Sequence, residues 1–185
     1  MKNIISNYLT QLQMVLANLD QNEILSVAEI LKNARKNKKQ IFIFGNGGSG
    51  STATHFACDI NKGVSYNRDE RFKVICLNDN IPTLLAYSND VGYEVVFAEQ
   101  LKNFVHEGDV VIGISGSGNS SNILKAMEVA KAHRAITIGI TGFSGGKLKG
   151  LADYSLNANV NDMQLSEDVH MIWVHIMMKC FENEN

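Results

Sequence analysis

The chain has 185 residues, of which 45% are hydrophobic and 19% charged, with one proline in all. This composition is typical of a globular protein, and the length suits one domain with a core on both sides of a sheet. The formal net charge of −2, with lysines scattered apart from the run Lys36, Lys38 and Lys39, excludes a basic surface for nucleic acid.

No apolar stretch reaches the roughly 20 residues that cross a bilayer, and residues 1–20 lack the apolar core of a signal peptide. Cys58, Cys76 and Cys180 lie far apart and show no CxxC spacing. We therefore expect no disulfide framework, no thiolate zinc site and no membrane segment, and we expect a cytoplasmic protein.

Two helices are predicted before the first strand. Between residues 4 and 19 apolar residues recur at spacings of three and four, which predicts an amphipathic helix, and a second helix is expected from about Asn22 to Lys36. This N-terminal helical pair (residues 1–38) has no strand of its own to flank. Its apolar face could pack on the sheet or cover a neighbouring subunit, and we favour a role in oligomerisation.

Five short apolar runs are typical of strands buried on both faces of a parallel sheet. They are Gln40–Gly45, Lys73–Leu77, Asp109–Ile114, Ala135–Thr141 and the weaker Tyr154–Ala158. Helical patterns separate these runs, and Met163–Phe181 is expected to form a long final helix. Residues 39–185 are thus predicted to be an α/β core, a three-layer doubly wound five-stranded parallel sheet, and residues 1–185 to form a single domain.

Segments rich in glycine and serine follow the first and third predicted strands. Gly45–Ser51 leads into a helix that should begin near Ser51, and Ser115–Asn122 leads into another helix. Glycine lets the backbone approach a ligand closely, and the start of a helix offers unpaired N–H groups to an anion. The first segment matches neither the P-loop nor the dinucleotide fingerprint, so we expect no nucleotide.

Both segments should face one crevice, because ligands of open α/β sheets bind outside the carboxyl ends of the strands. Ser115, Ser117 and Ser120 could donate hydroxyl hydrogen bonds to phosphate oxygens beside the backbone amides. Glycine-rich turns often serve only to turn the chain. Two such turns in one small sheet favour phosphate binding.

Ionisable residues occur in pairs on two of the predicted helices. His55 and Asp59 are four residues apart and share a face, and Glu167 and His175 are eight apart, with His170 on a different face. Each pair alone is typical of a solvated helix surface. If both helices border the crevice, two imidazoles and two carboxylates could transfer protons or bind a metal ion.

Four segments, in this order, resemble the sugar isomerase (SIS) domain family and, more narrowly, its phosphoheptose isomerase group. They are Gly45–Ser49, Ser88–Tyr93, Gly113–Ser120 and Thr141–Lys147, and the resemblance runs over nearly the whole chain. It implies a flavodoxin-like SIS fold, a homotetramer with active sites between subunits, and a phosphorylated sugar bound in the loops.

The resemblance also implies an enzyme, an aldose–ketose isomerase (intramolecular oxidoreductase) that converts sedoheptulose 7-phosphate to D-glycero-D-manno-heptose 7-phosphate through an enediol. The pathway stays open between lipopolysaccharide, capsule and other glycans. The alternatives are an isomerase of another phosphosugar, or a non-catalytic SIS module that senses phosphosugars or binds proteins. A close non-enzymatic relative has asparagine where this chain has His175, which favours the enzyme.

The resemblance assigns roles by position. Substrate would contact Asn46, Gly47, Gly48, Ser49, Asn89, Asp90, Ser115, Gly116, Ser117 and Ser120. Proton transfer would fall to Asp59, Glu167 and His175. Zinc, the expected cofactor, would bind to His55, Asp59, Glu167 and His175.

This chain departs from the group at two of these positions. Asp59 stands where the group usually has glutamate, so that carboxylate is one methylene shorter. Glu167 stands where the group usually has glutamine, so a neutral ligand is replaced by an anion. The added carboxylate should favour a divalent cation, and the two departures bear more on the identity of the sugar than on the class of reaction.

Overall fold

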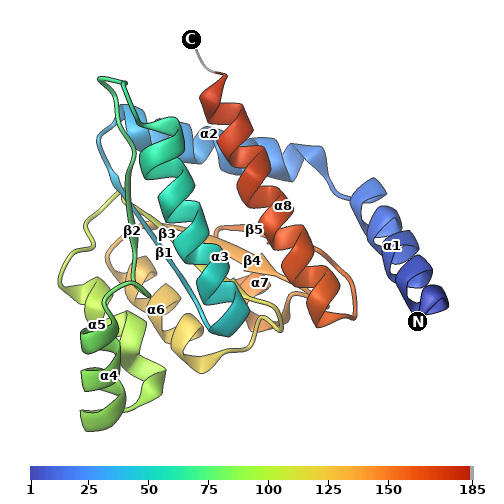
Figure 1. Ribbon diagram of the computed structural model, residues 1–185. Helices are drawn as coiled ribbons and strands as arrows, with labels where there is room; N and C mark the ends of the chain where they lie inside the picture. Colours follow the sequence, from blue (N-terminus) through green and yellow to red (C-terminus); the bar gives the residue numbers. More distant parts are fainter. Residues whose placement is uncertain (184–185) are drawn as a thin grey trace.

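The computed structural model describes residues 1–183, which form a five-stranded parallel sheet between two layers of helices (Figure 1). The strands are β1 (Gln40–Gly45), β2 (Lys73–Cys76), β3 (Val110–Ser115), β4 (Ile136–Thr141) and β5 (Tyr154–Asn157), in the order β2-β1-β3-β4-β5. This is the flavodoxin-like order, and every predicted strand is present within one residue of its expected bounds. The predicted fold class is confirmed.

Helices cover both faces of the sheet, as a buried parallel sheet requires. One face carries α2 (Gln21–Lys36), α3 (Gly47–Cys58) and α8 (Met163–Glu182). The other carries α5 (Val96–Lys102), α6 (Ser121–Ala132) and α7 (Gly146–Leu151). Between α3 and α5 lie three further helical elements: the π-helical turn η1 (Asp59–Val64), the helix α4 (Ile81–Asp90) and the 3₁₀ turn η2 (Tyr93–Val95).

The alternation of side chains along β1 shows how the two cores are filled. Ile41 and Ile43 point into the core under α2, α3 and α8. Phe42 and Phe44 point into the opposite core, where the ring of Phe44 stacks on Phe97 with a centroid distance of 4.9 Å. All four of these β1 side chains are fully buried, so β1 contributes to the cores on both faces of the sheet.

The two N-terminal helices differ in how they attach to the sheet. The second, α2, buries Val27 and Leu31 against the sheet. It therefore packs on the sheet, which was one of the two roles expected for the helical pair. The first, α1 (Lys2–Ala17), contributes no fully buried side chain within residues 1–183, and it projects beside α8 at the edge of the molecule (Figure 1). A hydrogen bond of 2.7 Å from the Tyr8 hydroxyl to Asp168 joins α1 to α8.

The helix after β1 begins earlier than the sequence pattern indicates, at Gly47 and not near Ser51. Glycine disfavours a helix by about 1 kcal/mol, which is why the pattern places the run GGSG in a loop. Gly47 has a φ of +52°, which favours glycine, and a Cβ built on Gly48 would lie 2.5 Å from a carboxylate oxygen of Glu167 on α8. Close packing of α3 against α8 therefore outweighs helix propensity here.

No helix within residues 1–183 is both long and apolar enough to cross a membrane.

Candidate active site

The crevice of the sheet lies between β1 and β3. These strands are neighbours, with Gly45 opposite Ile114, but the chain continues from β1 towards one edge of the sheet and from β3 towards the other. At such a switch point the two following connections diverge and leave a crevice at the carboxyl ends of the strands. Asn46 follows β1 directly and Ser115 ends β3, so both glycine- and serine-rich segments reach this crevice, as predicted.

The segment from Ser115 to Ser120, here called the serine loop, connects β3 to α6 and brings two hydroxyl groups together. The Oγ atoms of Ser115 and Ser120 are 3.1 Å apart. Ser120 occupies the N-cap position of α6, yet its side chain makes no capping hydrogen bond to the helix. The hydroxyl of Ser117 instead accepts a hydrogen bond from the Asn119 N–H within the loop. An uncapped helix start beside two hydroxyls suits an anion such as phosphate.

A second loop supports the serine loop from behind. The N–H of Gly142 donates to the Gly116 carbonyl at 2.8 Å, and the N–H of Leu148 donates to the Gly118 carbonyl at 2.9 Å. Gly118 has a φ of +68°, and any Cβ at that position would collide with the carbonyl oxygen of Gly145. The segment Thr141–Lys147, part of the sequence resemblance, thus holds the serine loop in shape.

Two residues at the crevice, Asn122 and Tyr93, were not identified as site residues from the sequence. Both contact Asn46, which was. Asn46 exchanges two side-chain hydrogen bonds with Asn122, and it accepts a third from the Tyr93 hydroxyl at 2.8 Å. Both partners lie within or directly beside segments that the resemblance covers. The contacts themselves join residues far apart in the chain, and one sequence contains no signal for such pairs.

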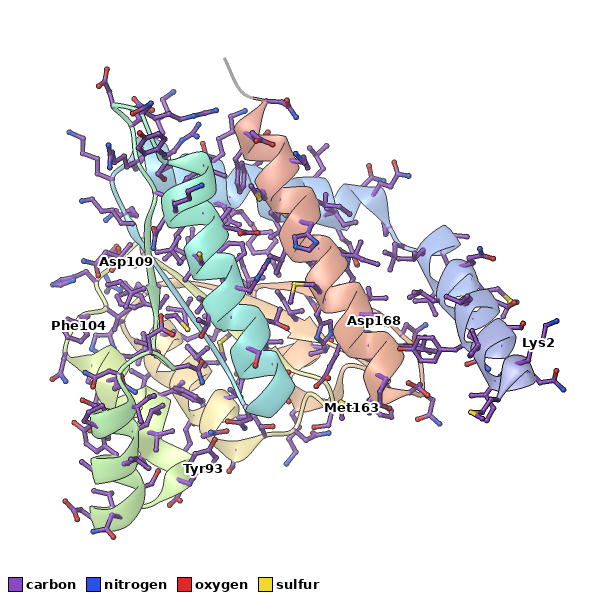
Figure 2. All side chains as sticks on the ribbon, in the orientation of Figure 1. Lys2, Tyr93, Phe104, Asp109, Met163 and Asp168 are labelled. Carbon is purple, nitrogen blue, oxygen red and sulfur yellow. The ribbon has the colours of Figure 1, made fainter. Side chains whose placement is uncertain are left out.

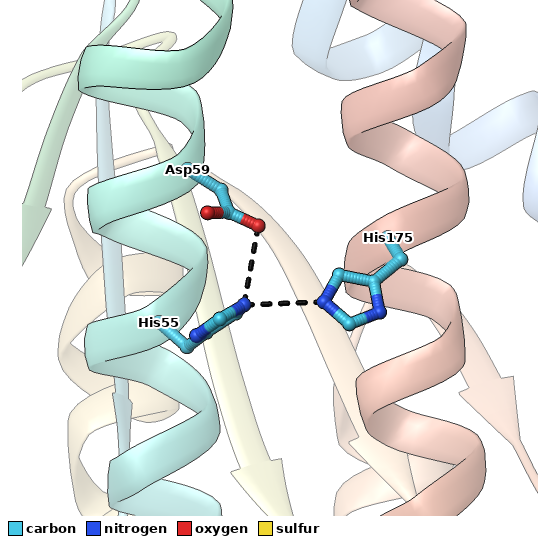
Figure 3. Close-up of side chains that lie close together, drawn as sticks. All are labelled: His55, Asp59 and His175. Atoms are coloured by element: carbon cyan, nitrogen blue, oxygen red, sulfur yellow. Dashed lines mark hydrogen bonds and ion pairs between the residues drawn. The ribbon is translucent and has the colours of Figure 1, made fainter.

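The imidazole pair lies further along α3, where this helix runs beside α8 (Figure 3). Nε2 of His55 is 3.1 Å from Nε2 of His175 and 3.2 Å from Oδ2 of Asp59. The His55 side chain is 45% exposed and that of Asp59 20% exposed, so a cation could reach the group from solvent. The structure therefore brings His55 and Asp59 together on one helix, and His175 to them from another.

The donor atoms of these three side chains have the separations that a small divalent cation requires. All lie within 4.8 Å of one another. A tetrahedral zinc ion with ligand bonds of about 2.0 to 2.2 Å would hold its ligand atoms about 3.4 Å apart, close to the distances around His55. Two imidazole nitrogens and one carboxylate oxygen are ordinary zinc ligands, so these residues fit the expected metal.

Glu167, the fourth expected ligand, lies elsewhere. Among the described residues the candidate metal-binding group comprises His55, Asp59 and His175, while the half-buried carboxylate of Glu167 packs against Gly48 at the start of α3. Two helical turns, about 12 Å along α8, separate Glu167 from His175. Glu167 thus lies between the crevice and the imidazole pair.

Asn89 and Asp90 end α4 on the surface, and the Asn89 amide donates to the Asp90 carboxylate at 2.8 Å. Both side chains are exposed. The structure of one chain brings them together with each other and gives them no contact with the serine loop.

His170 lies on the opposite side of α8 from the imidazole pair, in agreement with the helical spacing. It is fully buried, and its ring stacks on Trp173 with a centroid distance of 5.6 Å. Burial lowers the pKa of His170 to about 4, because a charged imidazolium would lose its hydration there. His170 is therefore a neutral core residue at physiological pH.

The fold and the crevice define a doubly wound α/β protein whose ligand site lies where β1 and β3 diverge. The chain belongs to the SIS domain family, whose model matches residues 6–142.

Several relatives of this chain are named phosphoheptose isomerases. The one from Helicobacter pylori (strain ATCC 700392 / 26695) is 39% identical over 88% of this chain and 84% of its own length. The one from Fusobacterium nucleatum is 35% identical and covers 97% of this chain and 94% of its own. The solved structure of the phosphoheptose isomerase from Neisseria gonorrhoeae superposes with a TM-score of 0.90 at 26% identity, over 99% of both chains.

Proposed function

We propose that this chain is an aldose–ketose isomerase that converts sedoheptulose 7-phosphate to D-glycero-D-manno-heptose 7-phosphate. The similarity to phosphoheptose isomerases over most of the chain supports the substrate. One observation favours an enzyme over a binding module: Nε2 of His55 is 3.1 Å from Nε2 of His175 and 3.2 Å from a carboxylate oxygen of Asp59. A binding module has no need of an imidazole pair beside a carboxylate.

The phosphate of the substrate binds at the serine loop. Ser115 and Ser120 donate their hydroxyl hydrogens, and the first backbone N–H groups of α6, which the Ser120 side chain does not cap, add further donors. Because these donors are fixed in place by the loop behind them, they lose little entropy on binding. The sugar chain then extends past the start of α3 towards the imidazole pair.

The chemistry is the movement of one proton between two neighbouring carbons. Asp59 removes a proton from C1 of the open-chain ketose, the C1–C2 double bond of the enediol forms, and the C2 oxygen takes a proton from His175. The same carboxylate returns its proton to C2, while His175 accepts the proton of the C1 hydroxyl. Asp59 is preferred to Glu167 as the base because only Asp59 lies in the group with His175.

We infer that zinc would bind to one atom each of His55, Asp59 and His175, the side chains that gather in the structure. The second carboxylate oxygen of Asp59 and the second ring nitrogen of His175 would then remain for proton transfer. Zinc would polarise the carbonyl of the substrate at this position. Three protein ligands are the usual number in catalytic zinc sites. Glu167 lies towards the crevice, where its carboxylate can contact the sugar chain.

We also infer a cytoplasmic homotetramer. Ile4, Ile5 and Leu9 on α1 are 72%, 60% and 54% exposed, a pattern that suits a helix covered by another subunit. A shallow groove lined by Ile172, Ile176 and Cys180 adjoins His175, so a subunit packed there would close the imidazole pair from solvent. The free thiols of all the cysteines suit a reducing compartment.

The test is incubation of the purified chain with sedoheptulose 7-phosphate, with and without zinc, while NMR follows the aldose. We expect formation of the heptose 7-phosphate, and loss of turnover when the metal is removed by a chelator. Conversion that is insensitive to chelation and to added zinc would contradict the metal proposal alone. Absence of conversion under all conditions would contradict the isomerase and favour a phosphosugar-binding module.

A further inference from the structure

Asn46, which follows β1, and Asn122, in the first turn of α6, form a closed pair of amides at the crevice. Nδ2 of Asn46 donates to Oδ1 of Asn122 at 2.9 Å, and Nδ2 of Asn122 donates to Oδ1 of Asn46 at 2.8 Å. Asn122 is 2% exposed, so its amide must find its partners within the protein. The pair therefore fixes the position of Asn46, the first residue after β1.

A backbone hydrogen bond determines which way round the pair is oriented. The N–H of Ile123 donates to Oδ1 of Asn122 at 3.0 Å. An N–H group cannot face an amide NH2 group, so the oxygen of Asn122 is identified by its partner. The reciprocal pairing then identifies the oxygen of Asn46, and the Tyr93 hydroxyl donates to that same oxygen at 2.8 Å. Tyr93 lies at the same end of the molecule as Met163, the start of α8 (Figure 2).

Counting donors and acceptors shows what Asn46 has left for a ligand. An amide oxygen has two lone pairs, and both are taken, one by Asn122 and one by Tyr93. The amide nitrogen has two hydrogens, and one is taken by Asn122. One N–H of Asn46 remains, and it can bond only to an oxygen that accepts.

We propose that Asn122 and Tyr93 are positioning residues that make Asn46 act only as a hydrogen-bond donor, towards a carbonyl or hydroxyl oxygen of the sugar chain. A free asparagine could rotate its amide and accept from a hydroxyl instead. This inference rests on the proposed function and specifies how the crevice recognises its substrate.

The test is a double-mutant cycle on kcat/KM for sedoheptulose 7-phosphate. Asn122→Asp keeps the shape of the side chain but removes the N–H that fixes the Asn46 oxygen. We expect kcat/KM to fall by about 10- to 100-fold, chiefly through KM, and Tyr93→Phe to lower it by about 3- to 10-fold. In the Asn46→Ala background neither substitution should lower kcat/KM further, because the residue that they position is gone.

Other outcomes have distinct meanings. Additive losses in the Asn46→Ala background would overturn the positioning role, since a new negative charge near phosphate or a general loss of structure acts without Asn46. If the wild-type chain shows no turnover, the proposed function fails. The hydrogen bonds of Asn46 to Asn122 and Tyr93 can still be tested by NMR in the absence of substrate. The side-chain amide signals of Asn46 in a ¹H–¹⁵N spectrum should then move in both variants, and unmoved signals would overturn the inference.

Discussion

The residues of the site differ in how far the sequence could predict them. The pairing of His55 with Asp59 follows from their helical spacing alone, and the structure contains it. His175 lies beside His55 because α8 packs against α3, and no local sequence pattern predicts that packing. Glu167 has the right spacing on α8, but its carboxylate lies against Gly48. Spacing fixes which face of a helix a residue occupies, and not what that face meets.

The two carboxylates near the site should differ in their effect on turnover. Asp59 shares its group with both imidazoles, whereas Glu167 lies two turns away. We expect Asp59→Asn to lower kcat by about 100-fold or more, because a general base and a metal ligand are lost together. Glu167→Gln has the same shape and should lower kcat by less than about 10-fold.

Steady-state kinetics with measured zinc content would check this difference. Zinc content should fall in Asp59→Asn and stay near the wild-type level in Glu167→Gln. Equal losses of activity and zinc in both variants would mean that Glu167 also holds the metal, which contradicts the three-ligand site.

The buried imidazole of His170 should make stability depend on pH. Its pKa is about 4 in the folded chain and about 6.5 when unfolded, so the unfolded chain binds the extra proton between these values. Stability is therefore full above about pH 6.5 and is lost as the pH falls towards 4, by roughly 3 kcal/mol in total.

Urea unfolding at several pH values between 4 and 7 would measure this loss. His170→Leu, which cannot take up a proton, should show a shallower fall in the free energy of unfolding over the same range. Parallel curves for the two proteins would assign the acid sensitivity to the carboxylates instead.

At the scale of elements, the inner strands β1, β3 and β4 were predictable because each is a short apolar run buried on both faces. The edge strands β2 and β5 contain exposed residues, and they were recognised by apolar residues such as Val74 and Leu156, which are buried. The start of α3 was not predictable, because its first residues are glycines, which disfavour a helix, and Gly48 lies against Glu167 of α8. The π-helical turn η1 (Asp59–Val64), which continues α3 at Asp59, has no signature in the sequence either. Both failures occur where one helix must fit closely against another.

The attachment of α1 gives a prediction at this scale. The Tyr8 hydroxyl donates to Asp168, and this bond together with the negative charge raises the pKa of Tyr8 to about 12. Tyr8→Phe removes the bond and keeps the ring. We expect backbone amides of α1 to exchange with deuterium several-fold faster, while those of α2 stay unchanged.

Thr10→Ser is a suitable control, because Thr10 bonds only within α1, to the Ser6 carbonyl. If Tyr8→Phe leaves exchange in α1 unchanged, the helix is held by its apolar contacts and the hydrogen bond to α8 contributes little.

For the whole molecule, the exposed apolar side chains of α1 predict how the chain assembles. Ile4→Glu with Leu9→Glu would place two charges on the face that we expect another subunit to cover. Light scattering should give a tetramer for the wild-type chain and a smaller mass for this variant. Thr10→Glu adds a charge to the opposite side of α1 and should leave the mass unchanged. A monomeric wild-type protein would exclude the tetramer.

The parallel alignment of α3 and α8 also affects how the protein matures during translation. His55 and Asp59 belong to the first third of the chain, while His175 lies near its C-terminus. A nascent chain therefore exposes two of the proposed metal ligands long before the third has been synthesised. A cation captured at that stage would be weakly held and easily exchanged, and firm retention would begin only when the last helix docks. Selection of the correct metal is then a property of the finished chain.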